Sequence, residues 1–167
     1  MPNLIRLRKF SFRFAEQVLN SKLSIKQEIE DILANPETDF RVLTRPFFND
    51  LLKKRFVSNG WESQPPVFNE PNDPSAKMDF LKERIGIEVE FGHSSFIGID
   101  LLKFQVASYS GLDKIDVGVY ITTTHNFQKR MRLDYGKNWK VLSVLKKLSD
   151  IFHTLREQYN CRFMLLE

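Results

Sequence analysis

The sequence contains a single cysteine, Cys161, and no long apolar run. One cysteine excludes an internal disulfide, and a chain without disulfides suits the reducing cytoplasm, where we expect this protein to be located. Residues 1–10 alternate basic and apolar side chains, and no segment approaches the roughly 20 apolar residues that a membrane span requires. The sequence therefore predicts neither a signal peptide nor an association with a membrane.

Proline is also sparse, and its distribution is uneven. Four of the seven prolines lie in residues 64–77, which predicts a loop along the surface. This segment is too short and too central to separate two domains. A chain of 167 residues buries roughly 70% of the surface that its unfolded form exposes. We therefore expect a single domain that spans residues 1–167.

The charges are unevenly distributed along the chain. The net charge is +4 and the pI is about 9.2, a mild basic excess that is compatible with a polyanionic partner. Basic residues cluster in residues 6–13 and 129–147, whereas Glu83, Glu88 and Glu90 lie between these clusters. Basic groups attract phosphate and acidic groups hold cations, so this pattern favours a metal-dependent nuclease.

The spacing of apolar residues predicts an alternation of helices and strands. We predict helices over residues 25–33, 47–58, 97–109 and 138–159. We predict strands over residues 84–91, 114–122 and 162–166, and a polar, basic loop over residues 122–138. This order predicts an α/β fold in which a mixed β-sheet is flanked by α-helices.

Two glutamates share one face of the strand predicted over residues 84–91. Side chains alternate along a strand, so Glu88 and Glu90 point the same way, about 7 Å apart. Adjacent carboxylates repel each other unless a cation lies between them. A hairpin or bend upstream of this strand would bring Asp79 beside Glu88. The alternative interpretation is a solvated strand face with Lys and Arg partners.

These acids have the chemistry of a magnesium site. Mg²⁺ prefers carboxylates, carbonyl oxygens and water, so the carboxylates of Asp79 and Glu88 and the backbone carbonyl of Val89 would hold one or two ions. Glu90 would orient or deprotonate the attacking water, whose pKa the metal lowers. The sequence therefore predicts metal-assisted hydrolysis of a phosphodiester bond.

Three stretches of the sequence, RPFFNDLLKKRFVSNGWESQ, MDFLKERIGIEVEFGHSSFIGIDLLKF and DKIDVGVYI, carry a family resemblance. Together they resemble the BglII/BstYI group of type II restriction endonucleases, which is related to BamHI and belongs to the PD-(D/E)xK nuclease superfamily. The resemblance covers most of positions 43–123, about half of the chain. It implies a restriction-endonuclease-like fold and Mg²⁺-dependent cleavage of double-stranded DNA at a palindrome that contains GATC.

The same resemblance implies roles for individual residues. It places the metal-binding acids at Asp79 and Glu88 and the last motif position at Glu90. It places a fourth, auxiliary catalytic residue at Gln64, with Glu62 as a competing choice. In the family, the turn after the catalytic strand and a later loop contact the DNA grooves. These segments correspond here to His93, Ser94 and Ser95, and to Gln128, Lys129, Arg130 and Arg132.

Arg paired with guanine and Gln paired with adenine are favoured geometries. The alternatives are that Ser94 and Ser95 only cap the following helix, and that the later loop is simply solvated.

The resemblance further implies a homodimer, because a palindromic site matches a two-fold axis. The predicted helix over residues 97–109 is our candidate for the dimer contact, although its apolar residues could instead fill the monomer's own core. The apolar residues in question are Leu101, Leu102, Phe104 and Val106. A cognate DNA methyltransferase is expected as a companion protein. Two other functions remain open: a DNA-binding relative that has lost cleavage, and a structure-specific repair nuclease.

Overall fold

A computed structural model describes residues 4–68, 76–92, 96–109 and 111–139, together with the backbone of the strand at residues 161–166. The helices are α1 (Ala15–Ser21), α2 (Leu23–Ala34), α3 (Arg45–Ser58), α4 (Ile97–Ser108) and α5 (His125–Tyr135). The strands are β1 (Leu7–Phe12), β2 (Glu62–Ser63), β3 (Phe80–Lys82), β4 (Ile85–Val89), β5 (Val117–Thr123) and β6 (Cys161–Leu166).

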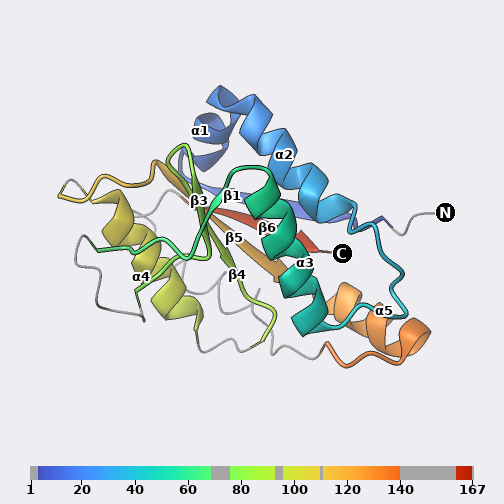
Figure 1. Cartoon of the computed structure of the whole chain (residues 1–167). Coiled ribbons are helices and arrows are strands. Elements are labelled where there is room, and N and C mark those ends of the chain that lie inside the picture. The colour runs from blue at the N-terminus through green and yellow to red at the C-terminus, as the bar shows by residue number, and fades with distance from the viewer. Residues whose placement is uncertain (1–3, 69–75, 93–95, 110, 140–160, 167) are drawn as a thin grey trace.

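The strands form one sheet in the order β1-β6-β5-β4-β3-β2. Strands β4 and β6 both pair with β5 in parallel, and every other pair is antiparallel. The sheet is therefore mixed, and the predicted α/β fold with helices on the sheet is confirmed (Figure 1). Because β4, β5 and β6 are parallel, their carboxyl ends lie at the same end of the sheet.

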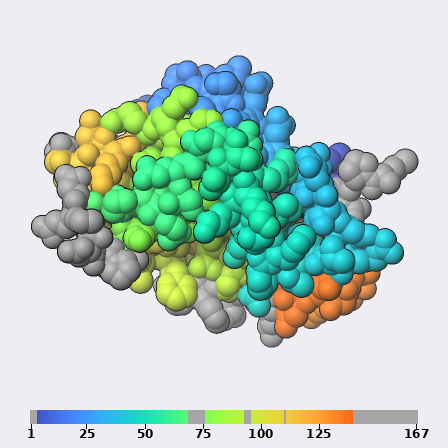
Figure 2. Space-filling view, viewed as in Figure 1, coloured from blue at the N-terminus to red at the C-terminus, as the bar shows by residue number. Residues whose placement is uncertain are grey.

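Two apolar clusters lie on opposite faces of the sheet. The larger one joins α1, α2, α3 and α5 to Ile87 of β4 and to Val119 of β5. The smaller one joins α4 to Tyr120 of β5. Because alternate residues of a strand point to opposite faces, Glu88 projects toward the α4 side, whereas Ile87 and Val89 face the larger cluster. Figure 2 shows that α1 to α3 and the segment after α3 form most of one surface, with α5 at its edge.

The predicted helices at residues 25–33, 47–58 and 97–109 are present as α2, α3 and α4, and the three predicted strands as β4, β5 and β6. Strand β1, helix α1 and the short strands β2 and β3 were not predicted. The loop predicted over residues 122–138 is wrong, because this segment contains α5. The helix predicted over residues 138–159 falls almost entirely outside the described residues.

The ends and the packing of α5 explain why this segment is helical. The side-chain oxygen of Thr124 accepts a hydrogen bond from the backbone N–H of Phe127 at 3.1 Å, which caps the first turn. Gly136 ends the helix in the left-handed conformation, with φ of 63°. Phe127 and Met131 lie one turn apart and are both buried in the larger cluster.

An aromatic cluster anchors α5 to the end of β4. The ring of Trp139 lies 5.2 Å from the ring of Phe127 and 5.7 Å from that of Phe91, which follows β4. Phe91 in turn stacks on Phe48 of α3 at 5.3 Å. The indole N–H of Trp139 donates to the carbonyl of Leu43 at 3.3 Å. This cluster therefore fixes the position of α5 relative to the strand that carries Glu88.

Candidate active site

Asp79 is folded back beside β4 by the hairpin of β3 and β4. Glu83 and Arg84 form the turn, with φ of 45° and 65°. Arg84 anchors the turn through hydrogen bonds to the carboxylates of Asp113 (2.6 Å) and Asp116 (2.8 Å), and its charge holds the pKa of Asp116 below the usual range. The turn pairs Phe80 with Ile87, which places Asp79 next to β4.

The side chain of Asp79 is held by two hydrogen bonds. Its Oδ2 accepts from the backbone N–H of Val89 at 2.8 Å, and its Oδ1 accepts from the side-chain amide of Gln64 at 3.0 Å. The backbone N–H of Gln64 also donates to the carbonyl of Asp79 at 3.0 Å. Glu62, the competing choice for the auxiliary position, is exposed on β2 and pairs with Leu81. The structure therefore joins Gln64, rather than Glu62, to Asp79.

Glu88 is almost fully buried, with 3% of its surface exposed. Its Oε1 accepts a hydrogen bond from the ammonium of Lys103 at 3.1 Å. Burial, together with the negative charges of Asp79 and Asp100 and against the effect of Lys103, raises the pKa of Glu88 to about 9. Asp79 lies near Glu88, because its carboxylate is hydrogen-bonded to the N–H of Val89, the residue after Glu88, and two carboxylates so placed repel each other. A divalent cation would remove that repulsion.

Helix α4 contributes Asp100 and Lys103 to this region. Neither residue was predicted to belong to the site from the sequence. The ammonium of Lys103 donates to the carboxylate of Asp100 at 3.0 Å as well as to Glu88. Burial raises the pKa of Asp100 above its ordinary value, and Lys103 opposes this change. The sequence did hold a signal: the spacing of Asp100, Lys103 and Phe104 places two charged residues on the buried side of the helix.

A glycine allows α4 to approach the sheet closely enough for this contact. A Cβ atom at Gly118 of β5 would lie 2.5 Å from the ring of Phe104 on α4, which is closer than packed atoms approach. Phe104 neighbours Lys103 in the sequence, so the absence of a side chain at Gly118 helps to set Lys103 within reach of Glu88. The tight packing of α4 therefore positions the charged groups of the site.

Glu90 lies just beyond the end of β4 and is half-buried. Its backbone N–H donates to the carbonyl of Ile121 at 2.9 Å, and its own carbonyl accepts from the hydroxyl of Thr122 at 2.7 Å. Its carboxylate accepts from the backbone N–H of Gly92. Glu90 also acts on Tyr120: burial first, and then the charges of Asp100, Glu90 and Glu88, raise the pKa of the Tyr120 hydroxyl.

The donor atoms fit a hard divalent cation in chemistry, because Asp79 and Glu88 offer oxygen ligands in a region of excess negative charge. Within the described ranges, no group of three or more His, Cys, Asp or Glu side chains is arranged to hold one ion together. Three carboxylates do not converge on a single point. Among the described residues, the carboxylates of Asp79 and Glu88 are the two predicted ligands that meet at the end of β4.

The residues proposed to contact DNA are described only in part. His93, Ser94 and Ser95 lie outside the described residues. Gln128 is half-buried on α5, and its amide donates to the hydroxyl of Thr123 at 3.0 Å. The other three, Lys129, Arg130 and Arg132, are exposed on the same helix.

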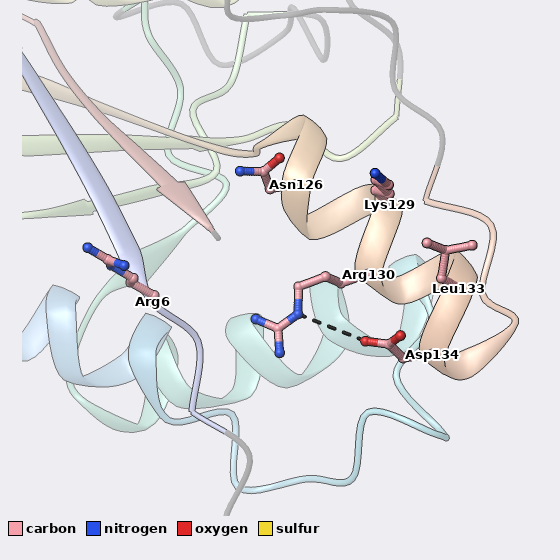
Figure 3. Close-up of a pocket in the computed structure, with 6 residues that line it drawn as sticks. All are labelled: Arg6, Asn126, Lys129, Arg130, Leu133 and Asp134. Carbon is pink, nitrogen blue, oxygen red and sulfur yellow. Dashed lines mark ion pairs between the residues drawn. The ribbon is translucent and has the colours of Figure 1, made fainter.

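A surface pocket lies between α5 and the residue before β1 (Figure 3). The cationic side chains of Lys129, Arg130 and Arg6 contribute to its lining, and Arg130 forms a 4.0 Å ion pair with Asp134. The other residues that line it are Asn126 and Leu133. The carboxyl end of β5 leads into α5, and Arg6 precedes β1 at the end of the sheet where β6 finishes. The pocket therefore lies at the same end of the sheet as Glu88.

The arrangement of sheet and helices defines a restriction-endonuclease-like fold, as two solved structures show. The crystal structure of restriction endonuclease BglII complexed with a DNA 16-mer matches with a TM-score of 0.66 and 16% identity, over 97% of this chain and 78% of that chain. Free BglII matches with a TM-score of 0.59 and 14% identity, over 97% of this chain and 79% of that chain.

The family follows from a second comparison. The profile of the family described as "Restriction endonuclease BglII/BglIII" matches residues 7–154, so the chain belongs to this family. Membership implies DNA nuclease activity, and the resemblance seen in the sequence is confirmed. No curated protein sequence matches the chain. In the part of the chain that the structure describes, no helix is long and apolar enough to cross a membrane.

Proposed function

We propose that this protein is a type II restriction endonuclease that hydrolyses phosphodiester bonds in double-stranded DNA at a specific sequence, with Mg²⁺ as cofactor. One observation carries the proposal. In a member of a DNA nuclease family, the carboxylate of Asp79 is hydrogen-bonded to the N–H of Val89, directly after the buried carboxylate of Glu88. Like charges that the fold forces together are typical of a cation site.

Each residue of the proposed site has a separate role. Asp79, Glu88 and the carbonyl of Val89 would hold one or two Mg²⁺ ions, which supply a water of lowered pKa and neutralise charge on the phosphate. The amide of Gln64 and the N–H of Val89 fix the orientation of Asp79 through hydrogen bonds of 3.0 and 2.8 Å. The carboxylate of Glu90 orients the attacking water or accepts its proton.

Digestion of a sequenced, unmodified genome with Mg²⁺, followed by mapping of the ends, tests the proposal. We expect discrete fragments whose ends share one palindrome, with a GATC-containing site as the first expectation from the family. Site-specific methylation by a cognate methyltransferase, the companion we propose, should abolish the cutting. Uncut DNA across varied substrates would contradict the nuclease assignment.

Two other outcomes would select the alternative functions. Salt-dependent DNA binding without metal-stimulated cleavage would identify a binding protein that has lost catalysis. A preference for flaps or mismatches over intact duplex would identify a structure-specific repair nuclease. The pairing of Asp79 with Gln64 and Val89 favours the catalytic alternatives, because both carboxylates remain in place.

Helix α5 is the surface through which we propose that DNA is bound. Lys129, Arg130 and Arg132 are exposed on it, and the pocket of Figure 3 adds Arg6 beside Lys129 and Arg130. Gln128 projects less freely because its amide is bonded to Thr123. His93, Ser94 and Ser95 remain proposed contacts from the turn after the catalytic strand.

Replacing Arg130 with alanine should weaken DNA binding and lower the slope of log K against log salt by roughly one, the effect of losing one phosphate contact. The control is Lys54→Ala on α3. It removes one charge from a similar ion pair, since Lys54 binds Asp50 and Arg130 binds Asp134, each four residues apart. Fluorescence anisotropy over a salt series measures both variants. An equal effect of the two changes would show that net charge alone matters and would contradict a local contact.

We propose a homodimer that uses the outer side of α4. Leu101 and Phe104, two of the residues considered for this contact, are buried in the monomer, and Val106 packs against the same cluster. Leu102 and Ile99 are 57% and 52% exposed. These two side chains therefore offer an apolar surface next to the site, as a partner copy would require.

Leu102→Asp should weaken dimerisation at least about tenfold, because a carboxylate without a partner is costly to bury. Val57→Asp on α3, at another exposed apolar position, serves as the control. Sedimentation equilibrium measures the association of both variants. An unchanged dimer in Leu102→Asp would rule out this side of α4.

The remaining expectations are also proposals. We propose that residues 1–167 form a single nuclease domain, and limited proteolysis that released a stable fragment would contradict this. The presence of a single cysteine is what supports a cytoplasmic location. Fractionation of expressing cells tests that location directly.

A further inference from the structure

Lys103 lies at the centre of the site, and the proposed function assigns it no role. Its side chain is 16% exposed, and its two partners are deeper still, with side-chain exposures of 4% for Glu88 and 9% for Asp100. Surface ion pairs are held loosely and contribute little. This group, by contrast, is enclosed and fixed by two hydrogen bonds, of 3.1 and 3.0 Å.

We propose that Lys103 is a built-in counter-cation of the metal site: its ammonium holds the Glu88 carboxylate until a divalent ion displaces it onto Asp100. The inference rests on the proposed function, because it concerns the same site. Lys103 is then a positioning residue. When metal binds, the divalent ion replaces the ammonium of Lys103 at the Glu88 carboxylate.

The contact atoms support an exchange. The ammonium occupies Oε1 of Glu88 at 3.1 Å, and a Mg²⁺ ion would approach such an oxygen to about 2.0–2.1 Å. An ammonium and a dication on one carboxylate repel each other strongly in a region from which water is largely excluded. A bound ion would therefore weaken the bond from Lys103 to Glu88.

Because Lys103 has a second partner, its ammonium can leave Glu88 and still be paired with a carboxylate. Asp100 lies one turn before Lys103 on α4 and already accepts a hydrogen bond from it. Lys103 can therefore leave Glu88 by a small rotation about its own side chain and keep a carboxylate beside it.

A purely structural ion pair is the competing explanation, and Lys82 provides the comparison. The Lys82 ammonium donates to both carboxylate oxygens of Glu28, at 2.9 and 3.0 Å, and its side chain is 20% exposed. Lys82 and Lys103 are thus similarly buried, and each donates two hydrogen bonds to carboxylate oxygens. Loss of either should lower stability, but only loss of Lys103 should alter the response to metal.

The test compares Lys103→Met with the wild-type chain and with Lys82→Met. Isothermal titration with Mg²⁺ at pH 9.5, above the pKa of about 9 at which Glu88 ionises, is done without DNA and gives the metal affinity. Thermal unfolding with and without Mg²⁺ at the same pH gives a second readout. We expect Lys103→Met to bind Mg²⁺ roughly tenfold more tightly, because a like charge beside the ion is gone. Its metal-free Tm should fall and its rise in Tm with Mg²⁺ should exceed that of the wild type. Lys82→Met should lose stability and keep the wild-type affinity.

The outcomes separate the inference from the function on which it rests. Mg²⁺ affinity in Lys103→Met that is unchanged or weaker would overturn the exchange, even if the wild type binds metal. A wild-type chain that does not bind Mg²⁺ at all would overturn the proposed cofactor itself. If Lys103→Met is unfolded without metal, recovery of its fold by Mg²⁺ supports the exchange, and failure to recover overturns it.

Discussion

Cleavage should fall by on the order of a thousandfold when Glu88 is replaced by glutamine. The amide is nearly isosteric with the carboxylate and can still accept a hydrogen bond from Lys103, so the packing around this buried position should survive. What it loses is the negative charge that, in our proposal, holds the metal. Metal stabilisation of the transition state amounts to several kcal/mol, and each 1.4 kcal/mol changes a rate about tenfold.

Single-turnover cleavage of a duplex that carries the mapped site measures this effect. Asp79→Asn should behave similarly, because Asp79 is the other carboxylate of the pair and is held by Val89 and Gln64. Glu62→Gln is the matched control, since Glu62 is exposed on β2. A Glu88→Gln enzyme that cuts within about tenfold of the wild-type rate would remove the catalytic role from this residue.

The second large effect concerns stability in the absence of metal. The pKa of Glu88 is raised from 4.5 to about 9 in the folded protein, chiefly by burial. The folded state therefore holds a proton that the unfolded state releases, and stability falls as the pH rises from 4.5 toward 9. Glu88→Gln removes this dependence. At pH 8 with a chelator, the variant should exceed the wild type by at least about 1.4 kcal/mol, the equivalent of one unit of pKa shift.

Urea unfolding at pH 6 and pH 8 with a chelator measures this difference. Asp116→Asn provides a contrast of opposite sign, because Arg84 lowers the pKa of Asp116. The stability that the ionised Asp116 contributes is present above its unfolded pKa and is lost as the pH falls through its lowered folded pKa, so this variant should be less stable than the wild type at pH 8. Equal stability of Glu88→Gln and the wild type at both pH values would show that the buried carboxyl of Glu88 does not lower the free energy of unfolding.

Together these two results would place Glu88 among residues that a protein keeps at a cost to its stability. The same substitution is expected to remove activity and to stabilise the fold. Activity and stability have opposite requirements of this kind where a site must bind a charged group from outside the chain.

Local sequence patterns were sufficient to predict the central elements of the fold and the family. The alternation along residues 84–91 predicted that Ile87, Val89 and Phe91 belong to a core on one face of the strand, and all three pack in the larger cluster. The long helices α2, α3 and α4 carry enough apolar spacing to be recognised. The family resemblance depended on combined motifs rather than on composition, and the family profile confirms it.

Other features depend on contacts between distant segments and could not be predicted in this way. Strand β1 is exposed along most of its length, and its pairing with β6 is what makes it a strand. Helix α5 was hidden by a polar, basic composition in which only Phe127 and Met131 are buried. The meeting of Lys103 with Glu88 requires α4 to pack over the sheet, and no spacing along the chain reports that distance.

The position of β6 between β1 and β5 affects when the sheet can form during synthesis on the ribosome. Strand β1 is made first, whereas its partner β6 is made after every other strand that the structure describes. Pairs that are so distant in sequence form slowly, because a very long stretch of chain must be closed into a loop. Residues 7–12 must therefore wait, unpaired, until translation of residues 161–166 is complete. A nascent chain that lacks residues 161–166 could therefore not yet hold the whole sheet together.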